Sequence, residues 1–154
     1  MERSGVLAPL GETKDEEEKG ETLMKAQLLR SSFDLISPEK FAHAFYVRLF
    51  ERYPELRPLF VQDIYIQERS LAATLEVIVQ AAEQQDDLSH MLYLLGKRHV
   101  KYGVLPEHYP LLGTTLLETF SLSLGERFTP AMREAWAETY ESVSAAMQKA
   151  AAEL

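Results

Sequence analysis

Apolar residues recur every three to four positions over most of the chain, which is the spacing of one face of an α-helix. This spacing and the helix stop signals predict helices over residues 22–35, 38–53, 65–83, 88–103, 106–124 and 130–154, with a short helical turn over residues 54–59. No segment shows the two-residue alternation of a strand or a β-hairpin turn. The pattern therefore predicts an all-α fold in a single domain.

Specific residues mark where several of these helices begin and end. Ser37-Pro38 and Thr129-Pro130 each combine an N-cap residue with a proline at the first helical position. Gly103 is a natural residue for a helix end, because glycine adopts the left-handed conformation easily. We therefore expect helices to start at Pro38 and Pro130 and one to end near Gly103.

Acidic residues are concentrated at the start of the chain. The chain has 24 acidic and 16 basic residues, a formal net charge of −8, and residues 1–22 carry seven of the acids but only three of the bases. A polar, strongly charged segment with few apolar residues is typical of a solvated, disordered region. We therefore expect an acidic, disordered arm over residues 1–21 and one folded domain over residues 22–154.

Composition excludes several classes of function. A net negative charge argues against a nucleic-acid partner, and the absence of cysteine excludes disulfides, thiolate zinc sites and Fe–S clusters. No apolar run is long enough to span a membrane, and the apolar patch over residues 6–10 is too short for a secretory signal, so we expect a cytoplasmic protein. Cofactor-free catalysis is poorly supported, because the chain lacks a Gly-rich phosphate loop, an HExxH pair and a GxSxG elbow.

The predicted helix over 88–103 presents one histidine among leucines. At about 100° per residue, His99 lies on the same face as Leu88, Leu92 and Leu95. Such a histidine can be an ordinary core side chain that is hydrogen-bonded to a carbonyl. It can also be a neutral imidazole that binds a metal. The other three histidines are not at zinc-ligand spacing from His99, so a zinc site is not expected.

Two further polar residues lie on apolar faces of other predicted helices. Gln67 shares a face with Leu71 and Ile78, and Tyr46 shares one with Leu49. Taken singly, these residues can be an exposed glutamine near a helix end and a core tyrosine with a satisfied hydroxyl. Taken together with one imidazole facing apolar side chains, they suit an iron porphyrin, with both side chains as hydrogen-bond donors on the ring face opposite the histidine.

Three blocks of the sequence resemble bacterial haemoglobins. They are LGKRHVKYGVLPEHYP over 95–110, FYVRLF with PELRPLF between 45 and 60, and FTP over 128–130 followed by Ala135, Trp136 and Tyr140. In their order and spacing these blocks are similar to single-domain bacterial globins and to the globin domain of flavohaemoglobins. The resemblance covers about residues 23–150.

The resemblance implies a globin fold around a b-type haem (iron protoporphyrin IX). By the matching positions, His99 is the proximal iron ligand and Phe60 packs against the haem face. Tyr46, Gln67 and Leu71 form the distal pocket, and Tyr109 lies near His99. The resemblance also implies less central contacts, namely Val104 and Leu112 as wall residues and Arg98 or Lys97 as a partner of a haem propionate, unless those charges are simply solvated.

The chain departs from flavohaemoglobins in two ways. In those proteins a glutamate on the last helix couples through the tyrosine to the proximal histidine, but the corresponding position here, counted without gaps from Trp136, is Ala151, and Glu153 follows two residues later. The sequence ends with the last predicted helix, so we expect no flavin or nicotinamide domain in it.

The resemblance implies reversible binding of O2 and of other gases such as NO and CO. Two donors to a ligand with partial negative charge would slow O2 release about 10²-fold or more relative to an apolar pocket. The expected role is O2 binding or NO detoxification. NO detoxification would be an NO dioxygenase activity that depends on a separate reductase. Two alternatives are a haem-based gas or redox sensor that acts through a partner protein and a haem-free interaction protein of globin fold.

Overall fold

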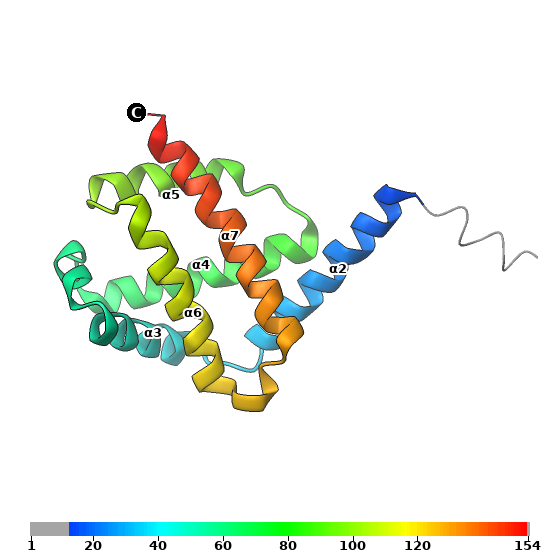
Figure 1. Cartoon of the computed structure of the whole chain (residues 1–154), viewed down its shortest axis with the longest axis horizontal. Helices are drawn as coiled ribbons and strands as arrows, with labels where there is room; N and C mark the ends of the chain where they lie inside the picture. The colour runs from blue at the N-terminus through cyan, green and yellow to red at the C-terminus, as the bar shows by residue number, and fades with distance from the viewer. Residues whose placement is uncertain (1–12, 154) are drawn as a thin grey trace, which may run out of the picture.

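The computed structural model describes residues 13–153 of the chain. These residues form α-helices joined by short 3-10 turns, with no strand among them (Figure 1), which confirms the all-α fold. The α-helices are α2 (Lys14–Phe33), α3 (Pro38–Arg52), α4 (Ile64–Gln84), α5 (Ser89–Lys101), α6 (Tyr109–Leu124) and α7 (Pro130–Ala152). The 3-10 turns are η1 (Pro54–Leu59), η2 (Pro106–His108) and η3 (Gly125–Arg127). Over the same part of the chain, no helix has the length and apolar character that crossing a membrane requires.

The predicted starts of α3 and α7 are confirmed. α3 begins at Pro38 directly after Ser37. α7 begins at Pro130 directly after Thr129, whose hydroxyl oxygen accepts a hydrogen bond of 3.1 Å from the backbone N–H of Met132. Proline at the first helical position leaves no intrahelical bond unmade, because that N–H has no partner in a helix.

The predicted start of the first helix near residue 22 is wrong, because α2 begins at Lys14. Thr13 and Glu16 form a capping box, in which the Glu16 N–H donates to the Thr13 hydroxyl at 3.2 Å and the Thr13 N–H donates to the Glu16 carboxylate at 3.1 Å. The cap and the acidic first turn stabilise the positive end of the helix dipole. The exposed first part of α2 leads away from the other helices (Figure 1). The rest of the predicted arm, residues 1–12, lies outside the described residues.

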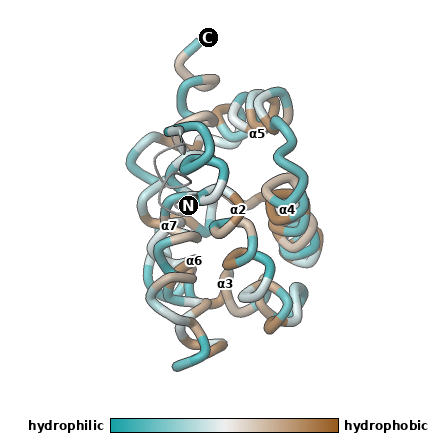
Figure 2. Tube along the Cα trace, turned by 90° about the vertical axis from the view of Figure 1, so that its right-hand side faces the viewer, coloured by the Kyte–Doolittle hydropathy of each residue, from teal (hydrophilic) through white to brown (hydrophobic). Residues whose placement is uncertain are grey.

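The helices enclose two apolar clusters. The larger one holds buried residues of α2, α3, α4, α6 and α7, with Trp136 and Phe120 among its most buried side chains. The smaller one joins α5, α6 and α7 through Leu92, Tyr109 and Met147. Hydrophobic and hydrophilic positions are both present along each helix in Figure 2, as is expected of amphipathic helices.

The packing separates the two helices that carry the predicted site residues. α5 packs mainly against α7, which runs across it, whereas α4 packs mainly against α2 and α3 (Figure 1). α5 therefore belongs to the smaller cluster and α4 to the larger one. The predicted site residues on these two helices therefore lie in different parts of the fold.

Candidate functional site

His99 lies half-buried in the last turn of α5, on the face that also carries Leu92 and Leu95. Its Nδ1–H donates a hydrogen bond of 2.8 Å to the carbonyl oxygen of Leu95. Burial lowers the pKa of His99, and the neighbouring Arg98 lowers it further, while the bond to Leu95 acts in the opposite direction. The imidazole is therefore neutral near neutral pH, and no other residue of the described chain bonds to its Nε2.

This geometry agrees with both interpretations of the histidine. A core histidine is expected to bond to a carbonyl, as His99 does. The same bond fixes the tautomer with its proton on Nδ1, so that Nε2 keeps a free electron pair, as a metal ligand requires.

Gly96, one turn before His99, lets α5 approach the backbone of α7. A Cβ on this residue would lie 2.9 Å from the Cα of Met147 and closer still to its carbonyl oxygen. Only glycine fits there without a backbone shift, so Gly96 allows the short distance between α5 and α7. This role is not among the predictions from the sequence, although a glycine inside an apolar helical pattern is a signal for it.

The chain turns sharply after α5 and returns to His99. Gly103 has a φ of 89°, which confirms it as the residue that ends the helix. The turn lets the N–H of Val104 donate to the carbonyl oxygen of His99 at 3.0 Å. Val104, half-buried against the smaller cluster, thus lies beside His99.

Tyr109 also lies beside His99, as the resemblance implies. It is buried at the start of α6, and its ring stacks at 27° to the His99 ring with 6.4 Å between centroids. Burial raises the pKa of its phenol. Its carbonyl oxygen accepts a bond of 2.7 Å from the hydroxyl of Tyr140. Within residues 13–153, no carboxylate bonds to His99 or Tyr109.

The second half of the site is an aromatic cluster around Tyr46 of α3. Tyr46 is only 7% exposed, and its ring contacts those of Phe50 and Phe60 with centroid distances of 5.8 and 5.5 Å. Phe60 follows η1 directly. Burial raises the pKa of Tyr46 to about 12; the Glu68 carboxylate adds to this rise and a hydrogen bond with Gln67 opposes it. The phenol is therefore protonated and can donate a hydrogen bond.

α4 supplies the remaining polar group of this half. Gln67 lies half-buried near the start of α4, close enough to Tyr46 to lower the pKa of its phenol. Leu71 lies one turn further on the same helix and packs against the larger cluster. Tyr46, Phe60, Gln67 and Leu71 therefore lie together, whereas His99, Val104 and Tyr109 form a separate group.

The charged residues expected near a propionate are less definite. Arg98 is exposed. The ammonium group of Lys97 lies 5.3 Å from the ring centroid of Tyr93, so it already has a partner on its own helix. Leu112 is half-buried in α6 and packs against the larger cluster.

The donor set suits a haem better than a bare metal ion. Within the described residues there is no cluster of three or more His, Cys, Asp or Glu side chains that could hold an ion. A haem needs a single protein ligand and apolar walls, and His99 with the surrounding leucine, valine and aromatic side chains provides both.

A further polar contact beside Gln67 was missed by the sequence analysis. The Nδ1–H of His43, on α3, donates to a carboxylate oxygen of Glu68 at 2.9 Å. The two residues are 25 positions apart, and no sequence pattern pairs them.

Comparisons with known proteins agree with this fold. The family model described as Globin matches residues 43–147. A neuroglobin from Tetraodon nigroviridis is 32% identical over 139 residues, which cover 80% of this chain and 87% of that protein. A flavohemoprotein from Pseudomonas aeruginosa is 36% identical over 104 residues, which cover 65% of this chain but 26% of the flavohemoprotein. The matched part is thus about a quarter of that relative.

Two solved structures have a similar fold. One is an engineered carbene transferase derived from a provisionally assigned nitric oxide dioxygenase of Rhodothermus marinus. It has a TM-score of 0.75 and 27% identity, and the match covers 84% of this chain and 92% of that one. A bacterial globin from Campylobacter jejuni has a TM-score of 0.69 and 24% identity. The match covers 84% of this chain and 96% of that one, and it supports the fold.

Proposed function

Because this chain belongs to the globin family, we propose that it binds b-type haem through His99 and uses the haem to bind O2. The observation that carries this proposal is the hydrogen bond from His99 Nδ1 to the Leu95 carbonyl, which leaves Nε2 with a free electron pair in a half-buried, apolar setting. When bound, haem supplies an iron that binds O2, NO and CO and can support the oxidation of NO to nitrate.

Tyr46 and Gln67 are proposed to hold O2 by hydrogen bonds. The Tyr46 phenol is buried and protonated, and the Gln67 side chain reaches it from α4. Both side chains carry a donor that can turn toward a ligand with partial negative charge. Each such bond contributes about 1.5–3 kcal/mol, so together they slow the release of O2.

Phe60 and Leu71 are proposed to close the distal side around these donors. Both are half-buried and pack against the larger apolar cluster. On the other side, Val104 and Tyr109 flank His99 and limit the rotation of its ring. Arg98 is exposed near His99, where it can meet a haem propionate.

NO detoxification is the role proposed for the bound O2. The support is the similarity to the engineered protein from Rhodothermus marinus, whose parent is provisionally assigned as a nitric oxide dioxygenase, and to flavohemoproteins. Repeated turnover requires electrons, and we propose that a separate reductase supplies them. A purified sample should therefore consume NO repeatedly only when a reductase and its electron donor are added.

The proximal assignment is tested by haem retention. The variant His99→Ala should lose the Soret band after haem reconstitution and desalting, because its only imidazole on the apolar face is gone. His90→Ala is the matched control, since His90 is an exposed histidine of the same helix. Normal retention in the His99 variant would remove this residue as the iron ligand.

The distal assignment is tested by the rate of O2 dissociation, measured by displacement with CO in a stopped-flow instrument. Tyr46→Phe and Gln67→Leu each remove one donor at nearly constant volume. Each should raise the rate about 10-fold or more. Rates equal to that of the unaltered protein would show that neither side chain holds the ligand.

A further inference from the structure

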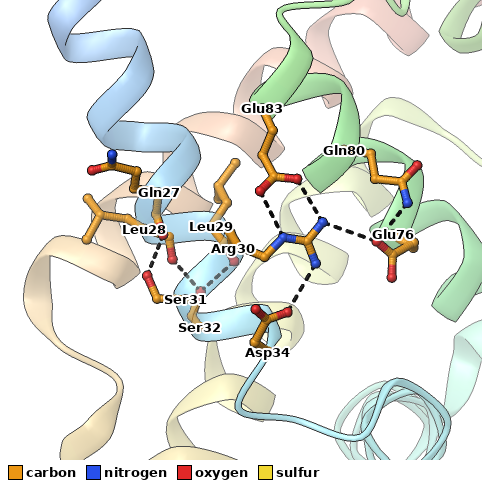
Figure 3. Close-up of polar contacts among 10 residues, drawn as sticks. All are labelled: Gln27, Leu28, Leu29, Arg30, Ser31, Ser32, Asp34, Glu76, Gln80 and Glu83. Carbon is orange, nitrogen blue, oxygen red and sulfur yellow. Dashed lines mark hydrogen bonds and ion pairs between the residues drawn. The ribbon is translucent and has the colours of Figure 1, made fainter.

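The position of α4 is set chiefly by two neighbouring helices. It packs mainly against α2 and α3, and α5 lies in the other apolar cluster. Within the described residues, polar side chains tie α4 to α3 near its start and to α2 along its second half. Near its end, Glu83 and Glu76 accept hydrogen bonds of 2.8 and 3.3 Å from the guanidinium of Arg30 on α2 (Figure 3).

Near its start, α4 is tied to α3 by His43 and Glu68. The Nδ1–H of His43 donates to the Glu68 carboxylate at 2.9 Å. The Glu68 side chain is 15% exposed, so its charge is largely removed from water, whereas the His43 side chain is 67% exposed. A hydrogen bond to a partly buried carboxylate is stronger than one at a fully exposed site.

This contact lies directly beside the proposed distal pair. Glu68 follows Gln67 in α4, and His43 precedes Tyr46 by one turn of α3. The two helices are thus joined at the surface by His43 and Glu68, and in the interior Gln67 lies close enough to Tyr46 to affect the pKa of its phenol. Because a hydrogen bond is lost beyond about 3.5 Å, a shift of about 1 Å between the helices decides whether Gln67 can bond to Tyr46.

From this arrangement we propose that His43 and Glu68 act as a positioning pair, which holds the start of α4 at the distance from α3 at which Gln67 reaches Tyr46 and the ligand. Neither residue touches the ligand. This inference rests on the proposed function, since it gives the pair its effect through Gln67.

Two substitutions of His43 separate a positioning role from a general effect on α3. Asparagine places an N–H donor at nearly the same position as Nδ1, whereas leucine has a similar size and no donor. Leucine is the better helix former, so an effect of helix propensity alone would favour the leucine variant. Both variants should fold, because the side chain is mostly exposed.

The O2 dissociation rate is the first measurement. His43→Leu should raise it about 3- to 10-fold, and His43→Asn should leave it within about 2-fold of the unaltered protein. In a Gln67→Leu background, His43→Leu should cause no further change, because the residue that it positions is absent. A similar rise in that background, or an unchanged rate in His43→Leu, would overturn the proposal.

The second measurement does not depend on O2. In the full chain loaded with haem and CO, the nuclear Overhauser contact between the Gln67 side-chain amide and the Tyr46 ring should be present, weaken in His43→Leu and persist in His43→Asn. An unchanged contact in His43→Leu would overturn the positioning role. If instead Gln67→Leu alone leaves the O2 rate unchanged, the proposed donor role of Gln67 fails, and the Overhauser contact still decides the positioning role separately.

Glu118→Gln is the control for a cross-helix ion pair away from the site. Glu118 of α6 accepts bonds of 2.9 and 2.6 Å from Arg48 and Arg52 of α3. Its loss should lower the free energy of unfolding without changing the O2 rate or the Overhauser contact. A change in either quantity as large as that in His43→Leu would show that any loosening of α3 suffices, and would overturn the specific role of His43.

Discussion

At the scale of single residues, the informative feature is a buried tyrosine whose phenol must stay protonated. The pKa of Tyr46 is raised to about 12, chiefly by burial. An unfolded tyrosine ionises near pH 10. Tyr46 therefore contributes stability that is fully present below about pH 10 and is lost as the pH rises from about 10 to about 12, because the folded state holds its proton more tightly over that range.

We expect Tyr46→Phe to reduce the decrease in the free energy of unfolding that occurs as the pH rises above about 10. The loss due to Tyr46 amounts to about 3 kcal/mol across the window, since each pH unit between the two pKa values contributes about 1.4 kcal/mol. The free energy of unfolding, measured by urea titration between pH 9 and pH 12, should fall less steeply in the variant. Tyr65→Phe, at a tyrosine that is 67% exposed, is the control and should keep the original slope. Equal slopes in all three proteins would contradict the burial of the Tyr46 hydroxyl.

At the scale of helices, the close contact between α5 and α7 determines where His99 lies. Gly96 is the residue at which the two backbones meet. Gly96→Ala should lower the free energy of unfolding by about 1–3 kcal/mol, because the added methyl group forces the helices apart. It should also weaken haem retention, since His99 is on the next turn. Unfolding by urea and transfer of haem to a competing apoprotein would measure the two effects.

Gly20→Ala is the matched control for this prediction. Gly20 lies in α2, and a Cβ on it would meet no atom within 4 Å. Alanine is a better helix former than glycine by about 1 kcal/mol, so this variant should be slightly more stable and retain haem normally. If both alanine variants gained stability, the approach of α5 to α7 at Gly96 would not be tight.

The same scale shows what the sequence could predict. Helices with a strong apolar period and a proline after the N-cap, such as α3 and α7, have the predicted starts, because these signals are local. The start of α2 differs from the prediction, because the acidic composition of this segment indicates disorder whereas the capping box of Thr13 and Glu16 starts a helix there. His99, Tyr46 and Gln67 could be proposed as site residues from the sequence because each is a polar residue on an apolar face.

Contacts between helices could not be found in this way. The pairing of His43 with Glu68 and the close approach at Gly96 depend on how helices far apart in the sequence cross each other. The periodicity of one helix shows which face is buried but not what that face meets. These contacts therefore needed the three-dimensional arrangement.

At the scale of the whole molecule, the end of α2 connects the first, middle and last parts of the chain. Arg30 bonds to Glu76 and Glu83 of α4 (Figure 3), and Ser32 accepts a hydrogen bond of 2.7 Å from the indole N–H of Trp136 in α7. Both Ser32 and Trp136 are almost fully buried. α4 carries Gln67, and α7 packs against α5, which carries His99. By bonding to both α4 and α7, α2 helps to fix the two parts of the proposed site relative to each other.

We expect Ser32→Ala to weaken the link between α2 and α7. The variant leaves the buried indole N–H of Trp136 without an acceptor, which should lower the free energy of unfolding by about 1–3 kcal/mol. Ser31→Ala is the matched control, because Ser31 is the neighbouring, exposed serine and its hydroxyl bonds to the carbonyl of Gln27, one turn earlier, just as that of Ser32 bonds to Leu28 (Figure 3). The control should be neutral or slightly more stable, since alanine favours a helix. Urea unfolding followed by circular dichroism would compare them, and equal stability of the two variants would show that the link from α2 to α7 does not depend on this bond.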